Sequence, residues 1–225
     1  MENVKENEKD KVNLTLSVEE YVRITYGHAY YQYVYDPQKK LLLVVMQDEL
    51  PPNPRENEDN LFRLLFTKKS GLGDKHDYST EELRDLTFLK DDQIVYNVYA
   101  YEHGSIGFSL SNNTYPYNDP WDSGQIGVAI ADLDSINKWY GWNYSTIQEI
   151  PSDKRDIIRD ELIDELDVYE AYVNGNVYFY VLSELKDNTF EDIDSCGGFY
   201  GTGSDVKKQM AEQLGDASYL LDRLD

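Results

Sequence analysis

The fold is decided by residues 94–131, IVYNVYAYEHGSIGFSLSNNTYPYNDPWDSGQIGVAIA, which contain three strand-like runs. β-Branched and aromatic residues fill 94–101, 107–111 and 125–131, a composition that is typical of strands. Glycine, asparagine, proline and aspartate lie between the runs, and these residues favour turns. The stretch therefore predicts consecutive strands of one sheet.

The residues before this stretch predict a helix and a second pair of strands. Ser17 and Glu20 have the spacing of a capping box, which favours a short helix over 18–24. The Tyr-rich run 28–36 and the aliphatic run 40–47 flank a turn, so we expect a hairpin. The remaining expectations before residue 94 are a loop over 49–60, a strand or short helix over 61–67 and a helix over 81–89.

The residues after the stretch predict the longest helix of the chain, over 153–173. Its apolar side chains recur on one helical face and predict packing against a sheet. Asn174-Gly175 suits a left-handed helix C-cap. The apolar face comprises Ile158, Leu162, Leu166, Tyr169 and Val173. The other expected elements are a short helix over 132–138, strands over 176–182 and 190–193, a glycine-rich loop over 194–201, and helices ending near residues 214 and 224.

Together these elements predict an α+β fold, in which a mainly antiparallel sheet packs with one long acidic helix and short C-terminal helices. No repeat and no linker composition divides the chain. We therefore expect a disordered N-terminal tail over 1–12 and a single α+β domain over 13–225.

The charge of the chain limits its partners. Asp and Glu number 43 against 21 Lys and Arg, which gives a formal net charge of −22. Such an excess disfavours direct contact with nucleic acid or an anionic membrane surface, and favours encounter with a basic protein. Plain solubility explains the charge equally well. A single cysteine, Cys196, and no apolar leader at the N-terminus indicate a reducing, cytoplasmic location.

Several short motifs occur together in a recognisable order. Asn53-Pro54-Arg55-Glu56 precedes Asp59-Asn60-Leu61, and Leu72-Gly73-Asp74-Lys75-His76 follows. Tyr101-Glu102-His103-Gly104, Pro120-Trp121-Asp122-Ser123-Gly124-Gln125 and Asp167-Val168-Tyr169 come next. The set ends with Asp194-Ser195-Cys196-Gly197-Gly198-Phe199-Tyr200-Gly201. In these motifs, over roughly residues 40–205, the chain resembles a family of small, mostly uncharacterised proteins of bacteriophages and other mobile elements. The resemblance implies a phage or plasmid context rather than a particular reaction.

The acidic helix supplies the candidate partner-binding residues. A row of carboxylates on one helix imitates a phosphate backbone, and the alternative interpretation is an ordinary solvated face. Like charges four residues apart cost a few tenths of a kcal/mol each. The candidates are Asp153, Asp156, Asp160, Glu161, Asp164, Glu165 and Asp167.

A second set of candidates suggests nucleophilic catalysis. Cys196 would be the nucleophile, His103 its base and Asp122 a further member of the site. Gly197 and Gly198 would place backbone N–H donors beside the thiolate. The alternative is an inert cysteine near a glycine turn, with His103 in a hydrogen bond at the end of a strand.

Two loops have chemical and structural interpretations side by side. Asp74-x-His76-Asp77 matches no closed zinc site or EF-hand, so we expect no metal site and no cofactor. Asp122-Ser123-Gly124 favours a turn, with Trp121 as a packing anchor. A cleft formed by the motif-bearing loops would bring together Arg55, Asp74, His103, Asp122 and Asp194.

From these patterns we expect an acidic phage-type inhibitor that blocks a nucleic-acid-binding host-defence nuclease by charge mimicry, as an anti-CRISPR or antirestriction protein does. The partner would be a basic nucleic-acid-binding protein of the host, reached in the host cytoplasm without direct contact with nucleic acid or membrane. The alternatives are a thiol-dependent hydrolase or transferase that uses Cys196 and His103, and a structural or adaptor protein of a phage.

Overall fold

The computed structural model divides into two compact units. The single domain over 13–225 stays a prediction. Unit 1 combines residues 1–51 and 175–225, and unit 2 comprises residues 52–174. The boundaries between the units fall at the Pro51–Pro52 and Asn174–Gly175 peptide bonds. No long linker therefore marks either boundary. The structure describes residues 16–27, 31–56, 59–67, 70–86, 92–111, 116–117, 119 and 121–224; the predicted tail over 1–12 lies outside them.

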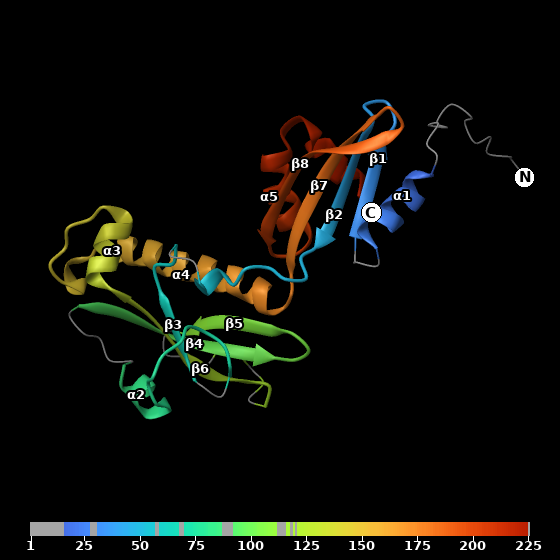
Figure 1. The fold of residues 1–225 in the computed structure, drawn as a ribbon. Coiled ribbons are helices and arrows are strands. Elements are labelled where there is room, and N and C mark those ends of the chain that lie inside the picture. The colour runs from blue at the N-terminus through green and yellow to red at the C-terminus, as the bar shows by residue number, and fades with distance from the viewer. Residues whose placement is uncertain are drawn as a thin grey trace, which may run out of the picture. The chain divides into compact units, whose positions relative to one another are not determined.

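Unit 1 is a four-stranded antiparallel sheet in the order β1-β2-β7-β8. Central strand β2 is apolar up to its last residue, Gln47, because both faces of the sheet are covered. Leu43 packs with α5 and η4, while Leu42 and Val44 pack with α1 on the other face (Figure 1). The elements are α1 (Val18–Tyr26), β1 (Tyr31–Asp36), β2 (Leu41–Gln47), β7 (Val177–Lys186), β8 (Thr189–Tyr200), α5 (Gly203–Leu214) and the 3₁₀ helix η4 (Gly215–Arg223).

Unit 2 is a second four-stranded antiparallel sheet, in the order β3-β6-β4-β5. Helix α4 lies along one face, and Leu83 of α2 packs with Leu65 and Val128 on the other (Figure 1). The elements are η2 (Pro54–Glu56), β3 (Arg63–Phe66), α2 (Thr80–Asp85), β4 (Gln93–Glu102), β5 (Ile106–Ser111), β6 (Ser123–Asp132), α3 (Leu133–Tyr140), η3 (Ile147–Glu149) and α4 (Ser152–Val173).

The predicted α+β fold with antiparallel strands and a long acidic helix is confirmed. The predicted apolar face of α4 is also confirmed, because Ile158, Leu162, Leu166 and Tyr169 are buried against the unit 2 sheet. The strands are distributed over two sheets, one in each unit, rather than gathered in one.

The predicted glycine-rich loop over 194–201 is wrong, because β8 continues to Tyr200. Phe179 of β7 pairs with Gly197, and the next pair along is Tyr178 with Phe199. Gly198 is the additional residue between them and has φ +79°, the conformation of a glycine β-bulge. The glycines therefore bend a strand and do not end it.

Candidate functional site

Five aspartates form a continuous line on helix α4. Successive residues of a helix are rotated by about 100° and rise by about 1.5 Å, so these five fall within about 80° of one another and span about 21 Å. Each of the five is exposed. We call them the α4 stripe: Asp153, Asp156, Asp160, Asp164 and Asp167.

The basic residues of α4 lie off this line. Lys154 holds its ammonium group 4.4 Å from the ring centre of Trp142 and 5.2 Å from that of Tyr144. At about 100° per residue, Arg155 lies about 140° around the helix from the centre of the stripe, and Arg159 lies about 100° from it. The stripe therefore carries negative charge without an interleaved cation of its own helix.

Asp167, at the C-terminal end of the stripe, has a raised pKa. Burial raises the pKa of Asp167, and the neighbouring carboxylates of Glu170 and Asp164 raise it further. A positive group placed against Asp167 would oppose these effects.

Glu165 is not available to a partner, so its assignment to the partner-binding set is corrected. Its side chain is 7% exposed, and Glu161 is half-buried. Glu165 Oε1 accepts hydrogen bonds from the backbone N–H groups of Leu61 (2.6 Å) and Phe62 (3.1 Å), and Oε2 accepts one from Arg55 Nη1 (2.8 Å). The residue belongs to the face of α4 that packs inward, where its charge is paired.

Arg55 is the centre of this buried network, with a side chain that is 4% exposed. Nε and Nη2 donate to the two carboxylate oxygens of Asp74, each at 3.0 Å. Nη1 also donates to Asn60 Oδ1 at 2.6 Å, and Nη2 to the carbonyl of Phe62. With the bond to Glu165, all five N–H donors of the guanidinium group have acceptors.

The network connects α4 to the segments on either side of β3. Asp74 Oδ2 also accepts from the Leu64 N–H at 2.8 Å, and Tyr169 Oη accepts from the Gly73 N–H at 2.8 Å. Burial raises the pKa of Glu165, and its hydrogen bonds with Arg55 and the backbone oppose that rise. The Asn53–Leu61 and Leu72–His76 motifs therefore contribute a structural ion cluster.

The predicted absence of a metal site at residues 74–77 stays a prediction, but the side chains there have other partners. Asp74 is bound to Arg55, and His76 Nε2 lies 2.6 Å from the carbonyl oxygen of Phe66. Within the described residues, no three or more His, Cys, Asp or Glu side chains are grouped so that they could hold a metal ion.

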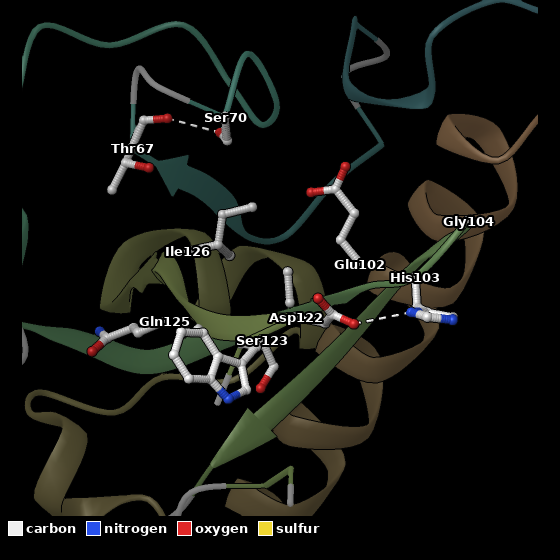
Figure 2. A pocket seen from close by; sticks show the side chains of 12 residues that line it. Thr67, Ser70, Glu102, His103, Gly104, Asp122, Ser123, Gln125 and Ile126 are labelled. Carbon is white, nitrogen blue, oxygen red and sulfur yellow. Dashed lines mark hydrogen bonds and ion pairs between the residues drawn. The ribbon is translucent and has the colours of Figure 1, made fainter. Parts of the chain in front are cut away.

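A second polar site lies at the β4–β5 hairpin. His103 Nδ1 and Asp122 Oδ2 are 2.9 Å apart, so the structure brings together two of the three residues predicted for catalysis (Figure 2). Together with Glu102 and Trp121, these two residues line a depression of about 720 Å³. Trp121 is 93% exposed and is not the packing anchor that the sequence suggested.

The predicted turn at Asp122-Ser123-Gly124 is also wrong. Ser123 and Gly124 are the first residues of β6 and pair with Tyr101 and Ala100 of β4. Asp119 makes the turn instead, because its Oδ1 accepts from the Trp121 N–H at 2.9 Å. The exposure of Trp121 was not predicted, because a tryptophan beside strand residues usually packs in a core.

Cys196, the third predicted catalytic residue, lies in unit 1 on β8, whereas His103 and Asp122 lie in unit 2. Cys196 is half-buried, pairs with Tyr180 of β7, and its Sγ lies 3.8 Å from the Gly197 carbonyl oxygen. Asp194 on the same strand accepts a 2.6 Å hydrogen bond from Tyr180 Oη.

The proposed convergence of five polar residues is thus replaced by separate contacts. Arg55 pairs with Asp74, His103 pairs with Asp122, and Asp194 contacts Tyr180 in the other unit.

Within the described part of the chain, the helices are too short or too polar to cross a lipid bilayer. Comparisons of the chain with protein-family models, with curated proteins and with solved structures find no match.

Proposed function

We propose that the protein is an acidic inhibitor that occupies the nucleic-acid site of a basic host-defence nuclease, in the host cytoplasm, with the α4 stripe as its contact. The observation that carries the proposal is the exposure of five aligned aspartates along one helix. A formal charge of −22 adds long-range attraction toward a basic partner and repulsion from nucleic acid itself.

The spacing of the stripe limits what it can imitate. Five carboxylates over about 21 Å give one charge per about 5 Å, whereas one strand of a duplex carries a phosphate every ~3.4 Å. The stripe is therefore a sparse copy of a single strand. A nuclease groove with separated Lys and Arg side chains matches it better than a groove that needs both strands.

The energetics of the helix agree with binding through this face. Neighbouring aspartates such as Asp156 and Asp160 repel each other by a few tenths of a kcal/mol in the free protein. A basic partner relieves that repulsion on binding. The Arg55–Glu165 contact holds α4 in place from the inner side, so the stripe is presented on a fixed helix.

The proposal is tested with two variants of equal net charge. The stripe variant converts the five aspartates of the α4 stripe to asparagine. The control variant neutralises five exposed carboxylates elsewhere: Glu49→Gln, Asp77→Asn, Glu81→Gln, Glu212→Gln and Asp222→Asn. Both variants carry a formal charge of −17, so a difference between them reports the position of the charges and not their number.

Each protein is immobilised, used to capture nucleases from a host lysate, and then tested as an inhibitor of the captured nuclease. We expect the wild type and the control variant to retain and inhibit a nuclease at low salt, in competition with duplex DNA or guide RNA. The stripe variant should lose about 1–5 kcal/mol of binding free energy, at about 0.2–1 kcal/mol for each exposed pair. Equal retention by the two variants, or retention independent of salt, contradicts charge mimicry by α4.

A further inference from the structure

The depression beside the β4–β5 hairpin contains a large apolar side chain in water. Trp121 is 93% exposed, and the depression of about 720 Å³ around it is lined mostly by polar side chains. An indole that is left in solvent keeps its whole apolar face available for a ligand, and tryptophan is among the residues most enriched where binding energy concentrates.

The backbone beside Trp121 is held in place. Asp119 Oδ1 accepts from the Trp121 N–H at 2.9 Å, and the Glu102 N–H donates to the Asp122 carbonyl at 2.7 Å. The second contact ties the start of β6 to the end of β4. The backbone that carries the indole is therefore hydrogen-bonded at Trp121 itself and at the following residue, which lowers the entropic cost of binding.

The polar groups around Trp121 include two carboxylates and a histidine ring. In a neutral His103 ring that donates from Nδ1 to Asp122 Oδ2, the other ring nitrogen, Nε2, is an acceptor (Figure 2). Asp122 has a second carboxylate oxygen, Oδ1. Within the described part of the chain, the carboxylate of Glu102 makes no hydrogen bond or ion pair. The depression thus combines an aromatic face with two carboxylates.

We propose that this depression binds a guanidinium group, stacked on Trp121 beside the carboxylates of Glu102 and Asp122. A guanidinium group is planar, carries five N–H donors and stacks on aromatic rings, so it matches both features of the site. An anion is opposed by the two carboxylates. An ammonium group has the charge but lacks the flat face, and a neutral sugar gains nothing from the charge.

The site is independent of the proposed function. It lies at the β4–β5 hairpin and the start of β6, and uses no residue of the α4 stripe. The inference therefore stands whether or not the stripe binds a nuclease. The guanidinium group belongs either to a small molecule or to an arginine of a protein, and the chemistry of recognition is the same for both.

The test follows the indole N–H signal of Trp121 by ¹H–¹⁵N NMR in the full-length protein. The probes are N-acetylarginine amide, its neutral isostere N-acetylcitrulline amide, N-acetyllysine amide and methyl glucoside. Trp139, which is 41% exposed on α3, provides an internal control for unspecific attraction to an acidic protein. Trp121→Leu assigns the signal, and Glu102→Gln tests the carboxylate.

We expect a saturable shift of the Trp121 signal with the arginine probe, no saturable shift with the citrulline probe and weaker binding of the lysine probe. Glu102→Gln should weaken arginine binding by about fivefold, the effect of losing one partly solvated ion pair. Equal shifts with arginine and citrulline, tighter binding of the glucoside, or equal shifts at Trp139 and Trp121 would overturn the inference.

A second pair of titrations identifies the source of the group. Agmatine represents a small guanidine, and a capped Gly-Arg-Gly peptide represents an arginine in a protein chain. Tighter binding of agmatine supports a small-molecule site, and equal or tighter binding of the peptide supports a protein partner. Failure of both to shift the Trp121 signal overturns the assignment.

Discussion

Replacing Arg55 with methionine should destabilise unit 2 more than any other single arginine substitution there. Methionine keeps much of the volume but removes all five N–H donors that the guanidinium group uses. Glu165 and Asp74, with side chains 7% and 18% exposed, then remain as carboxylates without their cation. Removal of one partner from a buried ion pair costs about 3–5 kcal/mol, and we expect a loss in this range.

A double-mutant cycle separates the ion pair from the rest of the network. Glu165→Gln keeps an oxygen that can accept from the Leu61 and Phe62 N–H groups and loses the charge. It should cost about 1.5–3 kcal/mol, the range for hydrogen bonds to charged groups. Arg55→Met combined with Glu165→Gln should cost less than the sum of the two single changes, because the orphaned charge on Glu165 is absent.

The position of the tryptophans makes the assay specific for one unit. Trp121, Trp139 and Trp142 are the only tryptophans of the chain, and all three lie in unit 2. Urea denaturation followed by tryptophan fluorescence therefore reports unit 2, and linear extrapolation gives its free energy of unfolding. The only cysteine, Cys196, lies in unit 1, so thiol labelling reports that unit in the same samples.

The matched control is Arg63→Met, which changes an exposed arginine on β3 and should stay within about 0.5 kcal/mol of the wild type. If Arg55→Met loses less than about 1 kcal/mol, or no more than the control, the network does not provide the stability that its burial implies. Additivity of the double variant would likewise refute a direct Arg55–Glu165 interaction.

Two further predictions concern unit 1. The hydrogen bond from Tyr219 lowers the pKa of Asp36, while burial and that bond raise the pKa of Tyr219 to about 12. Asp36 thus stabilises the fold above its ordinary pKa of 3.8, and this contribution is lost as the pH falls. Tyr219 stabilises the fold below its ordinary pKa of 10, and this contribution is lost as the pH rises above 10, where Tyr219 ionises in the unfolded chain. The stability advantage of the wild type over Tyr219→Phe should therefore be largest between these limits in pH-dependent urea denaturation, and a pH-independent difference would contradict the linkage. Cys196→Ala should leave nuclease binding unchanged while circular dichroism confirms the fold, whereas complete loss of an activity would favour the thiol-dependent alternative with His103.

The sequence predicted correctly those helices and strands that a local residue pattern specifies. Periodicity identified α4 and its buried face, and Ser17 with Glu20 forms the predicted capping box at α1. Alternation and turn residues located β4, β5 and β6 to within a few residues. These features depend on contacts between residues that are near in sequence, so composition and spacing determine them.

The separation into two units could not be predicted in the same way. β2 pairs with β7, and more than 120 residues separate these two strands along the chain. Pairing over such a distance depends on the whole chain, and the short crossings at Pro51–Pro52 and Asn174–Gly175 leave no compositional signal.

The sequence by itself determined the charge of the protein, the long acidic helix and the antiparallel strands. Only the tertiary structure decided which polar residues are structural and which face solvent. Glu165 and the α4 stripe are chemically similar and share one helix, yet Glu165 is turned toward Arg55 and the stripe toward water. Trp121 is exposed although its neighbours form a strand. The physical reason is that burial depends on what packs against a side chain, and those partners come from distant parts of the chain.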